Sequence, residues 1–208
     1  MGRVIGVDIA PQLLEIARQR TEQLGQVSLI QADAQHLDLQ PQSADAVFSR
    51  FGVMAFNDPI AAFTNFRRIL RPSGRLAFSC WRSLQENELD HVPLAAAGFR
   101  SPADESPFSL ADPEHIRRTL NAAGFGEIII ESHDEMVSSG DLDAMTEVLL
   151  KVGPLGKIVR DNPVLRATAE PRLREALAAL GDPSKVELSA SVWIVTARTE
   201  EASQTAPA

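Results

Sequence analysis

The sequence contains no tyrosine and only one cysteine among its 208 residues. The lone Cys80 cannot form an internal disulfide, and the apolar run around it indicates a small core residue in a reducing compartment. The chain has four histidines, with no pair at three- or four-residue spacing, so we expect no metal site. The absence of tyrosine excludes the Tyr-x-x-x-Lys proton donor that some oxidoreductases use.

Long apolar runs and an excess of positive charge are also missing. No run of about eighteen apolar residues and no signal peptide is visible, which predicts a cytoplasmic protein without membrane insertion. A net charge of -8 argues against nucleic acid as a partner, because nucleic acid requires a concentrated cationic face. The composition, 44% hydrophobic and 23% charged, is typical of a globular domain and gives no indication of oligomeric state.

The beginning of the chain predicts a strand, a helix and a second strand. The stretch from Arg3 to Val7 is mostly apolar and β-branched, with no charge between Val4 and Val7, as in a strand buried on both faces, and it leads into Asp8. Pro11 opens a helix, and a strand at residues 27–30 is followed by Asp33. A helical crossover between parallel strands leaves both strand ends on one edge of the sheet. We therefore expect Asp8 and Asp33 to be neighbours at the edge where ligands bind in α/β sheets.

Alternating strands and helices continue along the chain. Further strands are predicted at residues 44–49, 75–81, 127–131 and 191–197, and Asp58 and Asp112 are expected to cap helices. Residues 82–108 show little periodicity and are interpreted as a long cover over the site. The predicted fold is α/β, with residues 1–135 and 190–199 in one domain, 136–189 as a helical insert or lid, and 200–208 as a disordered tail.

Several short stretches, in this order and spacing, resemble one enzyme family. They are Gly-Val-Asp-Ile-Ala-Pro at 6–11, Ala-Asp-Ala at 32–34, Asp-Ala-Val-Phe-Ser-Arg-Phe-Gly at 45–52 and Leu-Arg-Pro-Ser-Gly-Arg-Leu at 70–76. Together they are similar to the class I S-adenosylmethionine-dependent methyltransferases, in particular the branch with the ubiquinone and menaquinone C-methyltransferases. The resemblance implies a Rossmann-like, doubly wound, mostly parallel sheet with an antiparallel last strand, S-adenosylmethionine as cofactor and a small-molecule acceptor.

The resemblance also implies roles for individual residues. Asp8 would bind the ribose hydroxyls, with Ile9 packed on the adenine. Asp33 would accept from the adenine amino group, with Ala34 behind the ring, although a helix-capping role for Asp33 stays open. The remaining implied contacts are Ser49 and Arg50 near the methionine part of the cofactor, and Phe51 facing the acceptor.

Some of these residues have alternative interpretations. Arg50 is as well explained by an ion pair with Asp45 or Asp58, and Trp81 by a core or rim position as by contact with the acceptor. His91 is our candidate for a catalytic base, against a solvated loop histidine.

The sequence departs from the family at its beginning. The family has a first strand, a glycine-rich loop and a helix ahead of the strand that begins at Val4. None of these three elements has a counterpart in this sequence. We therefore expect a start codon assigned too far downstream or a gene fragment, with poor or no affinity for the cofactor. Two other functions stay open: an inactive remnant serving as an interaction module, and a nicotinamide-dependent oxidoreductase, which also has an acid at a strand end.

Overall fold

The computed structural model describes residues 2–199, so the tail predicted at 200–208 lies outside the described residues. The first half of the chain contains β1 (Val4–Asp8), α1 (Pro11–Thr21), β2 (Val27–Gln31), β3 (Ala44–Arg50), α2 (Pro59–Ile69) and β4 (Leu70–Trp81). The second half contains α3 (Glu88–Ala96), α4 (Pro113–Ala122), β5 (Phe125–Val137), α5 (Leu142–Leu149), α6 (Gly153–Asp161), α7 (Arg166–Ala178) and β6 (Leu188–Thr199). Short 3-10 turns lie at Ala34–His36, Leu84–Glu86, Ser106–Phe108 and Pro163–Leu165.

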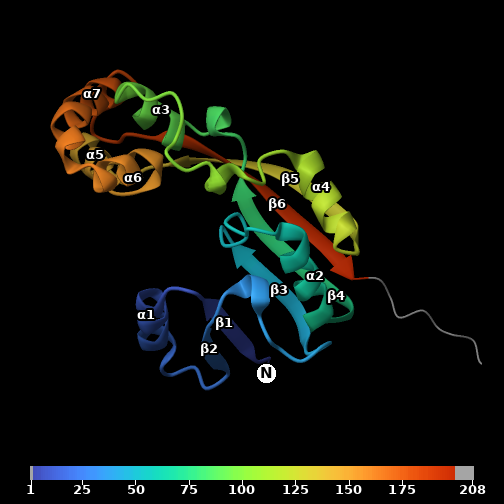
Figure 1. The fold of residues 1–208 in the computed structure, drawn as a ribbon. Coiled ribbons are helices and arrows are strands. Elements are labelled where there is room, and N and C mark those ends of the chain that lie inside the picture. The colour runs from blue at the N-terminus through green and yellow to red at the C-terminus, as the bar shows by residue number, and fades with distance from the viewer. Residues whose placement is uncertain (1, 200–208) are drawn as a thin grey trace, which may run out of the picture.

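The strands form two separate sheets. β1 and β2 pair in parallel, and a four-stranded sheet has the order β3-β4-β6-β5 (Figure 1). Within the larger sheet β3 pairs with β4 in parallel, whereas β6 is antiparallel to both β4 and β5. The predicted α/β fold with an antiparallel last strand is confirmed. Among residues 2–199 no strand pairs with both β1 and β3, so the two sheets are not joined by strand pairing.

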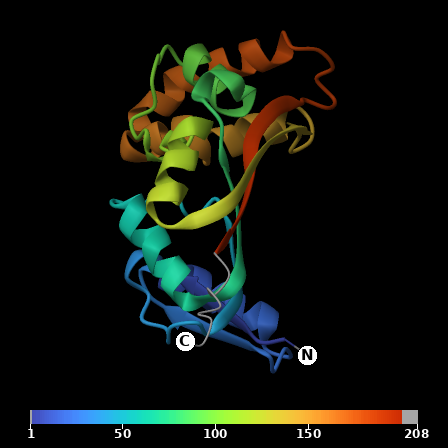
Figure 2. The ribbon, with the colours of Figure 1, turned by 90° about the vertical axis from the view of Figure 1, so that its right-hand side faces the viewer.

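One hydrophobic core lies between α2, α4 and one face of the larger sheet. Phe63 of α2 and Leu120 of α4 belong to the same buried cluster as Leu76 and Phe78 of β4. Figure 2 shows the ribbon of these helices and strands from the side. Cys80 belongs to the same cluster and is fully buried, which raises the pKa of its thiol to about 12 and confirms it as a core residue. The opposite face carries the exposed Phe48, Ile129 and Ile194.

A second hydrophobic core lies at the far end of β5 and β6. Buried residues of α5, α6 and α7, among them Met145, Leu155 and Leu173, pack there with Leu94 of α3 (Figure 1). The helical segment predicted before the last strand is therefore present. Residues 82–108 differ from the expectation of little regular structure, because α3 joins this second core.

The ends of several elements follow local capping chemistry. The Asp58 carboxylate accepts a hydrogen bond from the Ala61 N–H at 2.9 Å, and that of Asp112 accepts from the Glu114 N–H at 2.9 Å, so both predicted N-caps are confirmed. β5 and β6 are longer than predicted because their outer parts pair with each other, and β4 begins earlier than predicted, at Leu70, which pairs with Ala44 of β3. Among the helices of residues 2–199, none is long and apolar enough to cross a membrane.

Candidate functional site

Asp8 lies at the carboxyl end of β1, where its side chain organises the turn into α1. Its Oδ1 accepts a hydrogen bond from the Ala10 N–H at 2.8 Å. The other carboxylate oxygen has no hydrogen-bond partner among residues 2–199. Ile9, next in the chain, is 68% exposed. The free oxygen of Asp8 can accept a hydrogen bond from a sugar hydroxyl, and the exposed side chain of Ile9 can pack on a flat ring.

Asp33 lies at the same end of the neighbouring strand. The register pairs Asp8 with Gln31, and the Ala32 N–H donates to the Asp8 carbonyl at 3.1 Å, so both acids lie at one edge of the β1–β2 pair as predicted. The Asp33 side chain accepts from the Gln35 N–H at 2.9 Å and from the Gln35 amide at 3.2 Å. This is the capping arrangement weighed against the adenine role. Ala34 packs against the first core.

The end of β3 carries the next group of candidate residues. Arg50 is exposed and forms no ion pair within residues 2–199; Asp45 instead pairs with Arg71, and the Asp58 side chain caps α2. The carboxylate partners proposed for Arg50 are thus both engaged elsewhere. The Ser49 side chain lies against Gly52. A Cβ added to Gly52 would lie 2.9 Å from the Ser49 Oγ.

Phe51 and Trp81 connect the ends of β3 and β4. Their rings are stacked, with centroids 4.5 Å apart and planes 23° from parallel. The Phe51 N–H donates to the Ser79 carbonyl at 3.0 Å, and its φ of 58° turns the chain sharply after the strand.

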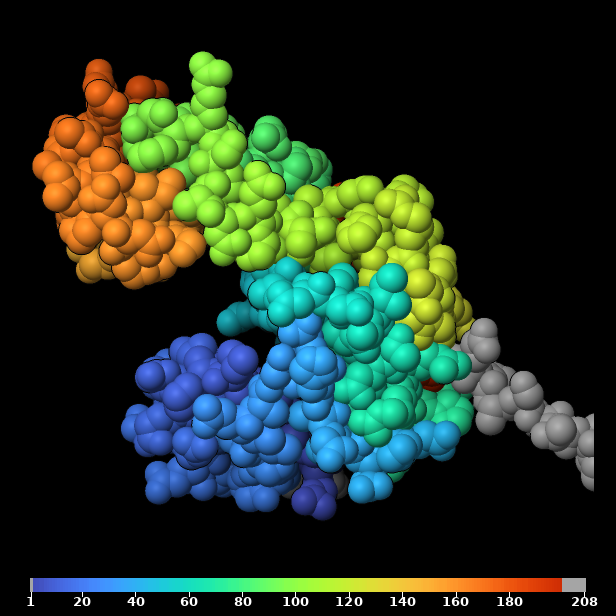
Figure 3. Space-filling model, in the orientation of Figure 1, coloured from blue at the N-terminus to red at the C-terminus, as the bar shows by residue number. Residues whose placement is uncertain are grey.

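Figure 3 shows a hollow between the dark blue N-terminal residues, the cyan segment after β3 and the orange helices.

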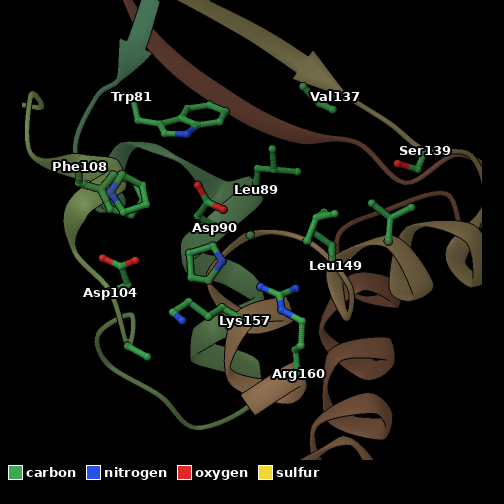
Figure 4. Close-up of a pocket in the computed structure, with 16 residues that line it drawn as sticks. Trp81, Leu89, Asp90, Asp104, Phe108, Val137, Ser139, Leu149, Lys157 and Arg160 are labelled. Atoms are coloured by element: carbon green, nitrogen blue, oxygen red, sulfur yellow. The ribbon is translucent and has the colours of Figure 1, made fainter. Parts of the chain in front are cut away.

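A pocket of about 480 Å³ opens beyond Trp81, between the two hydrophobic cores (Figure 4). Its walls come from α3, the loop at 103–108, the end of β5, α5 and α6. The volume lies within the ~300–1,000 Å³ typical of small-molecule sites. The lining is mostly apolar, with charged groups at Asp90, Asp104, Lys157 and Arg160. Trp81 is therefore a wall of this pocket as well as a partner of Phe51.

Asp90 rather than His91 lines the pocket. Asp90 is 6% exposed, and this burial raises the pKa of its carboxyl to about 6. His91 is half-buried on α3 outside the pocket lining. Asp90 was not predicted as a site residue from the sequence, although Asp90, Pro93 and Leu94 share the buried face of α3 at i, i+3, i+4 spacing.

Two polar side chains fix α3 to β6. Asn87 is fully buried; its Oδ1 accepts from the Ser191 N–H at 2.7 Å, and its Nδ2 donates to the Ser83 carbonyl at 2.9 Å. Glu88 accepts from the Ser189 N–H at 2.9 Å, and this bond lowers the pKa of the Glu88 carboxyl. The wall of the pocket that carries Asp90 is thereby tied to the sheet.

Comparison with known proteins shows similarity to methyltransferases. A family model described as a methyltransferase domain matches residues 1–78. The demethylmenaquinone methyltransferase of Staphylococcus saprophyticus is 26% identical over 148 residues, which cover 63% of this chain and 63% of that protein. The chain thus spans less than two thirds of the length of that relative.

Two solved structures are similar over nearly the whole chain. The YcgJ protein of Bacillus subtilis has a TM-score of 0.64 at 14% identity. The similar region covers 96% of this chain and 83% of the YcgJ chain. Phosphoethanolamine N-methyltransferase 2 of Haemonchus contortus, solved with S-adenosylhomocysteine, has a TM-score of 0.56 at 19% identity, covering 96% and 44%. The resemblance to class I methyltransferases is confirmed, and S-adenosylmethionine is the cofactor of that class.

Proposed function

We propose that the chain transfers a methyl group from S-adenosylmethionine to a small molecule bound in the pocket between the two cores. The Phe51–Trp81 stack supports this most directly, because it stands between the strand ends that carry the cofactor candidates and the pocket lined by Trp81. When bound, the cofactor supplies an activated methyl group on sulfur. The residues of the chain then have to hold, orient and shield the reactants.

Asp8 is the residue we assign to the ribose hydroxyls, with Ile9 against the adenine. Asp8 fits this role because one of its oxygens caps the turn while the other is free. Asp33 and Ala34 would border the adenine, and Ser49 and Arg50 would border the methionine part. Arg50 has the charge to attract a carboxylate and no competing ion pair among the described residues.

A matched pair of variants tests the ribose assignment. Asp8→Asn keeps an oxygen that can accept from the Ala10 N–H, whereas it loses the negative charge that strengthens bonds to hydroxyls. We expect wild-type thermal stability for Asp8→Asn, together with at least tenfold weaker binding of S-adenosylhomocysteine by calorimetry. Equal affinity in the variant and the wild type would refute the assignment.

Cofactor binding itself requires a second comparison, because no Gly-x-Gly-x-Gly loop occurs in the sequence. A thermal-shift titration with S-adenosylmethionine and S-adenosylhomocysteine should include this chain and a version extended by the codons upstream of Met1. A shift in the extended protein alone would support the expectation of poor affinity in this chain. A shift in neither protein would refute the methyltransferase proposal.

A second candidate, an interaction module without catalysis, is favoured by the exposed apolar face of the larger sheet. Phe48 is 76% exposed and lies on the same side as Ile129 and Ile194. Concentration-dependent association without any cofactor shift would support this alternative. The match to methyltransferases disfavours the nicotinamide-dependent oxidoreductase.

A further inference from the structure

The Asp90 carboxylate is buried and faces the pocket without a protein partner. Asp90 is 6% exposed, and among residues 2–199 no side chain or backbone group donates a hydrogen bond to it. Figure 4 shows it among Trp81, Phe108 and Leu89, with its oxygens toward the cavity. The oxygens open onto the cavity, so a ligand that donates a hydrogen bond there would pair this largely buried carboxylate.

Gly153 keeps the space beside this carboxylate open. An added Cβ at Gly153 would lie 2.9 Å from Asp90 Oδ1, and the φ of +69° at this residue suits glycine. Any other residue at position 153 would press on the carboxylate and narrow this side of the pocket. The lack of a side chain therefore leaves the acid accessible from the cavity.

The rest of the pocket selects for a neutral, largely apolar molecule. Trp81, Phe108 and Leu149 contribute ring and aliphatic surface. The other charged groups in the lining are one carboxylate, Asp104, and two cations, Lys157 and Arg160. With the Asp90 carboxylate these groups sum to no net charge, so the pocket as a whole does not favour a cationic ligand over a neutral molecule with a hydroxyl.

We propose that Asp90 accepts a hydrogen bond from the hydroxyl of an apolar, ring-containing methyl acceptor and removes its proton during transfer. The transfer step rests on the function proposed above. In that step the acceptor O–H bond breaks and its proton passes to Asp90. A bond forms between that oxygen and the methyl carbon, while the methyl–sulfur bond breaks with its electrons remaining on sulfur.

The surroundings of Asp90 agree with a proton-accepting role. Its pKa is raised to about 6 by burial, so the carboxylate is ionised at neutral pH and is a stronger base than an exposed aspartate. On α3 itself, Glu88 is held by the Ser189 N–H and His91 lies outside the pocket lining. Asp104, Lys157 and Arg160 face the cavity from the other elements.

The test measures binding of simple probes without cofactor, so it is independent of methyl transfer. The probes are 4-propylphenol, its methyl ether and 4-propylbenzylamine, titrated by calorimetry at pH 7.5 and pH 5. At pH 7.5 we expect the phenol to bind about tenfold or more tighter than the ether, the ratio for one hydrogen bond to a charged acceptor. The phenol is neutral at both pH values, because phenols titrate near ~10.

The variants identify the group responsible. Asp90→Leu should bring the phenol-to-ether ratio to about one, whereas the control Asp104→Asn, in the same pocket, should leave the ratio unchanged. In the wild type the ratio should fall at pH 5, since a protonated Asp90 is a weaker acceptor. Asp90→Asn, a close match in shape, should show a small ratio that does not change with pH.

Three results would overturn the proposal. They are an equal affinity of the wild type for phenol and ether, a tenfold ratio that persists in Asp90→Leu, and tighter binding of the amine than of the phenol. Circular dichroism verifies that each variant is folded, and Asp90→Asn supplies the answer if Asp90→Leu does not fold. A cofactor titration that fails while the phenol ratio holds would refute methyl transfer and leave the pocket assignment intact.

Discussion

Replacing Asn87 with alanine should destabilise the protein and loosen the wall that carries Asp90. Asn87 is fully buried between α3 and β6, and its amide bonds both the Ser191 N–H, at 2.7 Å, and the Ser83 carbonyl, at 2.9 Å. Ser191 is itself only 5% exposed, so water does not readily replace the lost partner. The variant therefore leaves a buried donor unpaired.

The magnitude follows from these two bonds. An unpaired buried N–H costs about 1–3 kcal/mol, and the lost bond to Ser83 adds roughly 0.5–1.5 kcal/mol. We expect the free energy of unfolding to fall by about 2–4 kcal/mol for Asn87→Ala. Asn87→Leu, which restores most of the volume but neither bond, should be destabilised by a similar amount, whereas a cavity alone would be relieved by leucine.

Urea unfolding followed by far-UV circular dichroism measures the effect. With a slope of roughly 2–3 kcal/mol/M for a protein of this size, the midpoint should fall by about 1 M. Asn121→Ala is the matched control, because this asparagine is exposed on α4 and should change the free energy by less than about 0.5 kcal/mol. If the free energy of unfolding fell by less than about 0.5 kcal/mol for Asn87→Ala, the role of Asn87 in fixing α3 to β6 would be refuted.

Three further predictions concern the pocket and the open sheet face. Because burial raises the pKa of Asp90 from 3.8 to about 6, its ionised form destabilises the folded protein by about 3 kcal/mol. Asp90→Asn should therefore melt higher than the wild type at pH 8, and the difference should disappear as pH falls through 6 toward 4; a constant difference would contradict this. Trp81 lines the pocket while the Trp193 indole N–H is bound to the Ala111 carbonyl at 2.7 Å. Probe binding should thus change the fluorescence of Trp193→Phe but not of Trp81→Phe, and the reverse pattern would place the probe elsewhere. Phe48→Ser should leave the midpoint of urea unfolding unchanged, because Phe48 is 76% exposed, and should reduce any self-association seen by light scattering; a lower midpoint would show that Phe48 is covered.

The fold was largely predictable where local chemistry decides it. The strand-helix-strand beginning, the caps at Asp58 and Asp112, and the shared edge of Asp8 and Asp33 all follow from turn residues and short apolar runs. The outer half of β5 was not predictable in this way. Its polar residues 131–135 form a strand because they pair with β6, and such long-range pairing leaves little trace in local sequence.

The candidate site was harder to predict because α3 contains a proline and buries polar side chains. Pro93 lies inside it, and of its polar residues Asp90 is buried while Glu88 and His91 are half-buried. Asn87 clamps β6 and Asp90 faces the pocket, so the polar positions that normally mark an exposed face are inside the molecule. The residue type predicted His91 as the base. In the structure Asp90 is the buried residue that lines the pocket, and His91 is outside the lining.

The separation of the two sheets has a consequence for how the molecule opens. Among residues 2–36, only the side chain of Leu14 is buried. In contrast, β4 and β6 contribute many buried side chains to the first core. The N-terminal unit, residues 2–36, is joined to the rest through polar bonds, such as that from the Asn57 N–H to Gln35 Oε1 at 2.8 Å, and through the packing of Ala34 on the first core. Few buried apolar contacts mean a low free energy of local opening. Hydrogen exchange should therefore be much faster in β1 and β2 than in β4 and β6, and cofactor binding at Asp8 should slow it selectively. Equal protection in the two sheets would refute the low free energy of local opening inferred for the β1–β2 unit.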